Sequence, residues 1–303
     1  MTKRKALVTG ATGFIGSHLV RHLLRAKWQV HVIVRPESDR SVLDGGSSLK
    51  VHEHTGSMDA MLSILTDTQP DVVFHLASLF LSKHQSADIN RLVESNILFG
   101  AQLLEGMTQV GVKALVNTGT AWQHYEGEQY NPVNLYAATK QAFETLLDYY
   151  TESNGIRSIT LKLHDTYGPS DPRPKLINLL VRVAVSNEPL AMSPGEQQLS
   201  LVHIDDVVSA FEIAAERLLE HPEIRREDFS VEPAQTCTLK QLVSEFETLV
   251  GRKLPISWGG RPYRKREIMV PWSGKKLPQW EQRVELRSGL SNLLQEFKSC
   301  DVE

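Results

Sequence analysis

The chain has 303 residues, of which 41% are hydrophobic and 23% charged, and its formal net charge is −3. These values are typical of a soluble globular protein with a substantial core, and the nearly balanced charge gives no argument for a nucleic-acid partner. The two cysteines lie far apart, so we expect no disulfide framework and no metal site, and no apolar run reaches the ~18 residues that a membrane span requires.

The basic N-terminus enters a strand within a few residues and lacks a signal-peptide pattern, so we expect a cytoplasmic protein.

Short apolar runs alternate with helical patterns through the first two-thirds of the chain. The predicted strands cover residues 5–9, 29–34, 49–54, 71–76, 112–118 and 158–163, and the main helical patterns between them cover 15–24, 89–103 and 137–150. Several strands are apolar at nearly every residue, as expected when helices cover both faces of a sheet. This order predicts an α/β fold with a doubly wound parallel sheet.

The pattern changes after Gly168, where a proline-interrupted basic loop begins. One further helix is predicted over residues 176–186. A second follows a short strand and begins at the acids Asp205 and Asp206. A third is capped by Thr238 and ends at Gly251. This part is too interrupted to fold alone. We therefore expect a dinucleotide-binding domain over residues 1–168 and a smaller, interleaved substrate-binding region over 169–303 that covers the open edge of the sheet.

The most informative segment is residues 6–35. Gly10, Gly13 and Gly16 follow the first strand and precede a helix, and a second strand leads to Arg35. Glycines in such a turn let the backbone bend tightly, approach a pyrophosphate and pack the helix on its strand, while the helix N-terminus offers free N–H groups to the phosphates. The spacing differs by one residue from G-x-G-x-x-G. An ordinary turn is the alternative, but the order of elements predicts a dinucleotide site.

Arg35 indicates which dinucleotide is bound. At this place an NAD enzyme usually carries an acid that binds the 2′-hydroxyl of the adenosine ribose. A carboxylate would repel a 2′-phosphate, whereas a guanidinium binds it well. We therefore expect NADP (as NADPH) rather than NAD, the alternative being that Arg35 is a solvated loop residue.

Tyr136 and Lys140 lie four residues apart in the sequence YAATK. On a helix this spacing places both side chains on one face. The pair is a weak signal by itself, but it is specific together with the glycine turn and FHLA at residues 74–77. Because a nearby ammonium stabilises a phenolate, we expect the pKa of Tyr136 to lie below its usual ~10.

These motifs, with NTGT, DTYGP and LVHIDDV, resemble the short-chain dehydrogenase/reductase superfamily, in the extended branch that acts on nucleotide sugars. The resemblance covers nearly the whole chain and implies a Rossmann fold. It also implies that Tyr136 is the acid/base, that Lys140 supports it, and that a Ser or Thr hydroxyl polarises the reacting oxygen. For the hydroxyl we favour Thr120, at the tip of the strand, over Thr118.

The resemblance further implies the cofactor contacts and the assembly. The expected cofactor residues are Gly10, Thr12, Gly13, Phe14, Ile15, Gly16, Arg35, Leu76, Ala77, Asn96, Tyr136 and Lys140. Asn96 is expected either to position the active site through a water or to pair helices as a buried amide. Helices near residues 88–108 and 136–150 are expected to pair across a two-fold axis into a homodimer.

The residues after the threonine limit the reaction. Dehydratases of this branch carry two acids there, or a polar residue and an acid, but here Ala121 and Trp122 follow. This leaves reduction of a ketone or epimerisation. If Arg35 binds the 2′-phosphate, net reduction by NADPH is favoured over an epimerase with tightly held NAD. A non-catalytic dinucleotide-binding regulator is the other alternative, and the presence of both Tyr136 and Lys140 counts against it.

A nucleotide-sugar substrate is anionic, so its site should contain bases. The expected substrate residues are Thr120, Trp122, His124, Asp165, Arg173, Lys175, Arg261 and Arg264. His124 is either a ligand contact or a surface histidine, the arginines are either diphosphate ligands or part of a solvated loop, and Asp165 either faces a sugar hydroxyl or is structural. Leu199 stands where the family often has an arginine, which implies that a different arrangement of residues binds the diphosphate.

Three longer stretches narrow the resemblance. NTGTAWQHY, NPVNLYAATKQAFE and DTYGPSDPRPKLINLL are similar to the reductases of the CDP-abequose and CDP-paratose synthase type. This similarity implies NADPH-dependent reduction of the 4-keto group of a CDP-linked 3,6-dideoxyhexose. We expect no nucleic-acid and no membrane partner.

Overall fold

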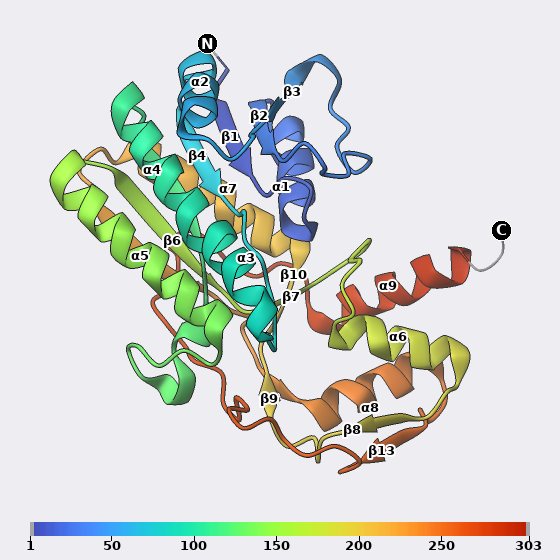
Figure 1. The fold of residues 1–303 in the computed structure, drawn as a ribbon. Coiled ribbons are helices and arrows are strands. Elements are labelled where there is room, and N and C mark those ends of the chain that lie inside the picture. Colours follow the sequence, from blue (N-terminus) through green and yellow to red (C-terminus); the bar gives the residue numbers. More distant parts are fainter. Residues whose placement is uncertain (1–2, 301–303) are drawn as a thin grey trace.

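A seven-stranded parallel sheet forms the centre of the protein (Figure 1). The structure is a computed structural model and describes residues 3–300. The strands of the sheet are β1 (Lys5–Thr9), β2 (Gln29–Val34), β3 (Leu49–Glu53), β4 (Val72–His75), β5 (Ala114–Thr120), β6 (Arg157–Leu163) and β11 (Arg226–Val231). Their order is β11-β6-β5-β4-β1-β2-β3, so the winding reverses between β1 and β4. Ligands of such sheets bind outside the carboxyl ends of the strands at this reversal.

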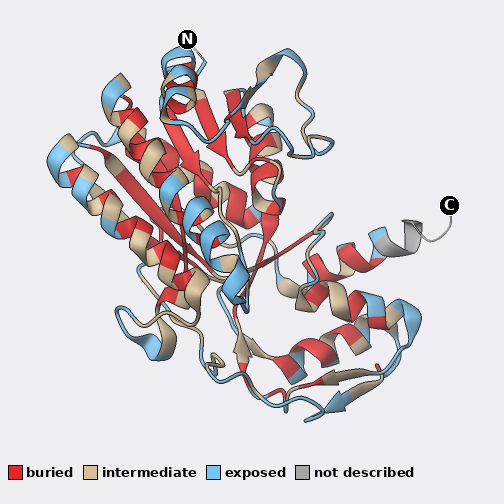
Figure 2. Ribbon diagram, in the orientation of Figure 1, coloured by how far each residue is buried: buried red, intermediate tan, exposed pale blue. Residues whose placement is uncertain are grey.

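Helices cover both faces of the sheet, which confirms the predicted doubly wound α/β fold. Helices α1 (Phe14–Arg25) and α7 (Ile204–Glu220) pack on one face, and α2 (Met58–Thr68), α4 (Phe99–Val110) and α5 (Leu135–Asn154) pack on the other. Neighbouring strand residues enter opposite cores: Val72 and Phe74 belong to the core of α1 and α7, and Val73 to the other. Figure 2 shows the central strands buried along their length.

The predicted strands all form, with changes at their ends. The strand predicted over 112–118 is Ala114–Thr120, because Gly111 ends α4 in the left-handed region and the Val112 amide still bonds to Met107 O at 2.9 Å. The seventh strand, β11, was not predicted. Its first three residues, Arg226, Glu227 and Asp228, are charged, so its sequence lacks the apolar pattern of a buried strand. It pairs with β6 alone. It is the edge strand of the sheet on the β6 side, and the predicted division of the chain at Gly168 stays a prediction.

The helical pattern predicted over 89–103 forms a continuous helix made of three segments. A short turn η2 (Ser86–Asp88) leads into α3 (Ile89–Val93), a π-helical turn η3 (Glu94–Leu98) and then α4. The π turn contains Asn96 and was not predicted. Such turns occur frequently at functional sites. Short 3₁₀ turns also occur at η1 (Gly46–Ser48), η4 (Ala121–Gln123) and η5 (Tyr125–Gly127).

The last third of the chain forms a separate hydrophobic cluster around three helices. These are α6 (Leu176–Ser186), α8 (Leu239–Val250) and α9 (Leu286–Cys300), grouped at the end of the molecule opposite the N-terminus (Figure 1). Three small strand pairs connect them: β7 (Asp165–Tyr167) with β10 (Leu201–His203), β8 (Leu190–Met192) with β13 (Ile256–Trp258), and β9 (Gln198–Leu199) with β12 (Cys237–Thr238).

The signals predicted for the helix ends are confirmed. Thr238 caps α8 in a capping box, and Gly251 ends it with a φ of 73°. Asp205 and Asp206 lie in the first turn of α7. Helices α2 and α9 were not predicted. Within the described residues, no helix combines the length and the apolar character that a membrane crossing requires.

Candidate active site

The turn after β1 is too tight for any residue but glycine at two of its positions. Gly10 has a φ of +71°, and a β-carbon on it would lie 2.6 Å from the Ala77 nitrogen. A β-carbon on Gly16 would lie 2.1 Å from the Gly10 oxygen. The Gly13 amide donates to that oxygen at 3.0 Å. The turn therefore has the close backbone approach that a pyrophosphate site requires.

The start of α1 also suits an anion. The helix begins at Phe14, and within the described chain no side chain caps it and no acid lies in its first turn. The N–H groups of that turn can therefore bind phosphate oxygens. Thr12 and Ile15 remain partly exposed at the turn, whereas Phe14 is buried. This geometry fits the expected dinucleotide.

The predicted residues at the end of β4 lie against this turn. Thr9 Oγ1 accepts from the amides of Leu76 and Ala77 at 3.2 and 3.1 Å, and lies 2.9 Å from His75 Nδ1. These bonds fasten the ends of β1 and β4 together. The segments that follow β1 and β4 therefore form one continuous surface at the point where the winding of the sheet reverses.

Arg35 directly follows β2, and its side chain is 75% exposed. Its Nε lies 3.2 Å from Glu37 Oε1. The guanidinium is thus at the strand end where the cofactor ribose is expected, but it is paired with an acid that the sequence analysis did not consider.

Tyr136 and Lys140 lie in the first two turns of α5. Asn134 caps the helix by accepting from the Ala137 amide at 3.0 Å, which places Tyr136 directly after the helix start. Tyr136 is partly buried, and its ring meets the Phe80 ring edge-on at 5.0 Å between centroids. Lys140 is buried. The spacing puts both side chains on one helix face, as predicted.

The expected lowering of the Tyr136 pKa is wrong. Burial raises the pKa of Tyr136 to about 12, and this effect exceeds the opposing hydrogen bond with Ser78 and the charge of Arg173. Burial also lowers the pKa of Lys140 to about 8. The neighbouring ammonium was expected to lower the pKa of Tyr136, but removal of both groups from water disfavours the charged form of each.

Both candidate threonines lie at the end of β5 and face the same side of the strand. Thr120 is its last residue, and Thr120 Oγ1 accepts from the Trp122 amide at 3.3 Å. Thr118 Oγ1 is buried without a hydrogen-bond partner among the described residues. The structure places Thr120 at the strand tip, as expected, and the choice between the two hydroxyls stays a prediction.

Asn96 uses its whole amide on protein partners. Its Nδ2 donates to Leu79 O at 3.1 Å and to Thr139 Oγ1 at 2.9 Å, and its Oδ1 accepts from the Leu79 amide and from Ser78 Oγ. The amide therefore joins the π turn to α5 and to the segment after β4. Any role of Asn96 at the site is indirect, through the position of Ser78.

An aromatic wall joins several predicted substrate residues to Tyr136. The Phe80 ring lies 5.6 Å from the Trp122 ring and 5.3 Å from Lys175 Nζ. Lys175 Nζ in turn lies 3.3 Å from Asp165 Oδ1. Phe80 was not predicted, although its position shortly after the FHLA strand end is a signal that could have found it.

Arg173 lies on the cofactor side. Its guanidinium lies 4.4 Å from the centroid of the Phe14 ring, and its Nε pairs with Asp171 Oδ1 at 2.7 Å. Its charge favours the phenolate of Tyr136. Arg173 therefore stands between the glycine turn and Tyr136.

Three other predicted substrate residues are not seen in contact with this group. Arg261 and Arg264 are exposed in the loop after β13, where the Arg264 amide donates to Glu267 Oε2 at 3.1 Å. His124 is half-buried and stacks on the Trp272 ring at 4.1 Å between centroids. It is thus a packed residue in the structure, and its part in binding stays a prediction.

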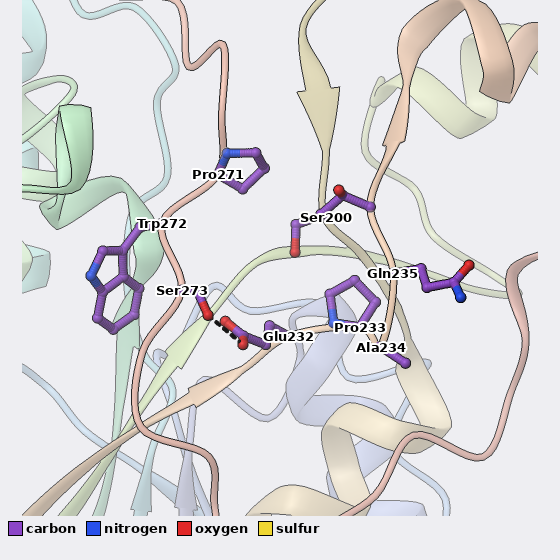
Figure 3. A pocket seen from close by; sticks show the side chains of 9 residues that line it. Ser200, Glu232, Pro233, Ala234, Gln235, Pro271, Trp272 and Ser273 are labelled. Atoms are coloured by element: carbon purple, nitrogen blue, oxygen red, sulfur yellow. Dashed lines mark hydrogen bonds between the residues drawn. The ribbon is translucent and has the colours of Figure 1, made fainter.

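A pocket of about 460 Å³ is lined in part by Trp272, the ring on which His124 stacks (Figure 3). The segments 232–236 and 271–273 face one another across it, and Glu232 accepts from Ser273 Oγ at 2.7 Å. Ser200 also lines it, and Ser200 O accepts from the Asp165 amide at 3.1 Å. The pocket thus adjoins Asp165 and, through Trp272, His124. Sequence reasoning missed its walls because both are loops without a motif.

No cluster of His, Cys, Asp or Glu suited to a metal ion occurs among residues 3–300.

Comparison with known proteins identifies relatives by sequence and by fold. The sequence profile of the NAD dependent epimerase/dehydratase family matches residues 6–226. CDP-abequose synthase of Yersinia pseudotuberculosis is 29% identical over 268 residues, which cover 88% of this chain and 91% of that protein. CDP-abequose synthase of Salmonella muenchen is 23% identical over 96% of this chain and 97% of that protein. The solved structure of UDP-glucuronic acid 4-epimerase from Bacillus cereus, in complex with UDP-glucuronic acid and NAD, matches with a TM-score of 0.86 at 23% identity, over 98% of this chain and 99% of that one. This last likeness shows the shared fold.

Proposed function

The chain belongs to the NAD dependent epimerase/dehydratase family, and on this basis we propose that it reduces the 4-keto group of a nucleotide-linked deoxyhexose with NADPH. A CDP-4-keto-3,6-dideoxyhexose is the substrate we expect. The observation that carries the proposal is the aromatic wall of Phe80 and Trp122 beside Tyr136, in which Trp122 occupies one of the two positions where a dehydratase would carry its acids. Similarity to proteins named CDP-abequose synthase supports the same substrate class.

The cofactor would lie along the wall formed by the ends of β1 and β4. Gly10, Gly13, Gly16 and the N-terminus of α1 would hold its pyrophosphate, and Arg35 its 2′-phosphate. When bound, it supplies the hydride that reduces the sugar carbonyl carbon.

Tyr136 would donate its proton to the keto oxygen. Its raised pKa keeps the phenol protonated at neutral pH, so the donor is ready before the reaction. Charge then develops on the phenol oxygen, and the ammonium of Lys140 and the guanidinium of Arg173 would stabilise it there. The hydroxyl of Thr120 would hydrogen-bond the reacting oxygen.

The substrate side combines one base with apolar surface. Phe80 and Trp122 would pack against the deoxygenated carbons, and Lys175 and Asp165 would contact polar groups of the sugar and its diphosphate. Arg261 and Arg264 remain our candidates for the diphosphate.

An NAD-dependent nucleotide-sugar 4-epimerase is the second candidate, and the ion pair of Arg35 with Glu37 is the observation that favours it. An acid at this position suits a ribose hydroxyl better than a phosphate. The test is a panel of 4-keto sugar nucleotides offered with NADPH and with NADH. Cofactor that co-purifies, with no consumption of added NADPH, would favour the epimerase. A Tyr136→Phe variant that keeps every assayed function would favour a non-catalytic regulator.

We also propose a homodimer formed through the helices of residues 89–110 and α5. Three side chains on this side expose large apolar surface: Val93 is 43% exposed, Leu98 50% and Tyr149 63%. Apolar side chains of this kind mark a protein contact where they form a contiguous patch. A monomer mass by light scattering at micromolar concentration would contradict this proposal.

A further inference from the structure

A buried ion pair lies beneath the predicted catalytic residues. Glu144 Oε2 is 2.6 Å from Lys162 Nζ, and the two side chains are only 2% and 5% exposed. Glu144 lies one helical turn after Lys140 on α5, and Lys162 lies on β6, directly beside Gly119 of β5. Neither member of this pair was predicted as a site residue.

The pair is connected to Thr120 through one amide side chain. Gln123 Nε2 donates to Glu144 Oε1 at 3.1 Å, and Gln123 Oε1 accepts from the Thr120 amide at 2.9 Å. Gln123 is fully buried. Gln123 Nε2 also donates to Gln141 Oε1 at 2.6 Å, so Glu144 and Gln141 together hold the amide that fixes the backbone of Thr120.

The strand itself makes room for the pair. A β-carbon on Gly119 would lie 2.7 Å from Lys162 Cδ and 3.0 Å from Glu144 Oε1. Glycine at this position allows the charges to approach β5 closely, between the two candidate threonines. Their position relative to the end of the strand is thereby fixed.

The pair also sets the charge around Lys140. The charged groups that act on Lys140 are Glu144 from α5 and Lys162 from β6, and Lys140 in turn acts on His75 from β4. Tyr136 lies one helical turn before Lys140 on α5. Burial keeps the pKa of His75 at about 3, so it is neutral, and Tyr136 is protonated. Two buried ammonium groups thus share one buried carboxylate. Glu144 raises the pKa of Lys140, and Lys162 lowers it.

We propose that Glu144 is a positioning residue of the reductase: it neutralises Lys162, so that Lys140 remains charged, and it holds Thr120 in place through Gln123. This inference rests on the proposed function. A role in stability explains the pair less well, because a buried ion pair often contributes no more to stability than apolar residues of the same volume.

The test compares two single variants whose effects should oppose each other. Glu144→Gln leaves Lys162 without its counter-charge, so the alkaline limb of the pH profile of kcat/KM should move down by about one pH unit, because Lys140 loses its proton more readily. Lys162→Met removes the competing cation, so the same limb should move up. The double variant should return toward the wild-type profile. Glu152→Gln, on the exposed side of the same helix, is the control that should leave the profile unchanged.

A second readout does not depend on catalysis. The pH titration of the Lys140 side-chain carbon signal in NMR, assigned by its loss in Lys140→Met, should shift in the same opposite directions. If wild-type protein reduces no 4-keto sugar nucleotide, the proposed function fails, but the titration still tests the charge coupling. Unchanged Lys140 titration in both folded single variants, or shifts in the same direction, would overturn the inference. Should Glu144→Gln fail to fold, the upward shift in Lys162→Met decides alone.

Discussion

Gly10 and Ala77 meet through their backbones: a β-carbon on Gly10 would lie 2.6 Å from the Ala77 nitrogen. The two residues lie just after the ends of β1 and β4, where the winding of the sheet reverses. No side chain fits between them. The close approach of β1 and β4 at the expected cofactor site therefore requires glycine at position 10.

Gly10→Ala should destabilise the protein by about 2–4 kcal/mol, since it adds overpacking against backbone to the strain of a left-handed conformation. Gly155→Ala is the matched control, because Gly155 has a similar φ of +68° with nothing within 4 Å of its missing β-carbon. Its cost should be about 1–2 kcal/mol. Chemical denaturation measures both variants. Equal losses would show that the close approach to Ala77 is unimportant.

Arg35→Ala should raise the KM for NADPH by about 10- to 100-fold and leave that for NADH nearly unchanged, because a hydrogen bond to a charged group contributes about 1.5–3 kcal/mol. Arg40→Ala, a nearby arginine paired with Glu53, is the control. Glu37→Gln removes the acid that pairs with Arg35 and should lower the KM for NADPH. Steady-state kinetics with both cofactors check this, and equal effects on NADPH and NADH would refute a 2′-phosphate contact.

Phe80→Ala should reduce the preference for a 3-deoxy over a 3-hydroxy 4-keto sugar nucleotide by about tenfold, because an apolar pocket discriminates by about 1–3 kcal/mol per group. The ring touches both Tyr136 and Trp122, so its removal opens the wall to water. Phe80→Leu keeps an apolar surface and should retain most of the preference. The ratio of kcat/KM values for the two substrates is the measurement. A ratio that does not change in Phe80→Ala would remove Phe80 from the substrate site.

Acid should destabilise the fold through its buried histidines. Burial lowers the pKa of His75 to about 3, so the unfolded chain takes up a proton before the folded one. This contribution to stability is complete above pH ~6.5 and is lost as the pH falls toward the folded pKa, amounting to about 2 kcal/mol by pH ~5. His75→Asn, which can still accept from Thr9, should lose correspondingly less stability between pH ~7.5 and ~5. An equal acid loss in both proteins would contradict this account.

The sequence predicts most of the fold because its signals are local. The glycine turn, the apolar strands and the caps at Thr238 and Gly251 each act within a few residues, and the structure has them where they were expected. The edge strand β11 was not predicted, because the charged residues at its start break the apolar pattern by which the other strands were identified. The division at Gly168 stays a prediction.

The candidate site was predictable only in its motif residues. Tyr136 and Lys140 lie one turn apart on one helix. Phe80, in contrast, contacts Tyr136 from the segment after β4, and Glu144 on α5 pairs with Lys162 on β6. Such pairs follow from packing and leave no pattern in the sequence. The pKa of Tyr136 depends on burial for the same reason.

The central claim is that Tyr136 protonates a sugar ketone that NADPH reduces. The direct test is the absorbance of NADPH on addition of a CDP-4-keto-3,6-dideoxyhexose, with wild-type protein and with Tyr136→Phe. We predict one NADPH consumed per substrate reduced, and a rate about 10²- to 10⁴-fold lower in the variant at similar NADPH binding. Undiminished turnover by Tyr136→Phe, or conversion of a sugar nucleotide by the wild type without consumption of NADPH, would contradict the account.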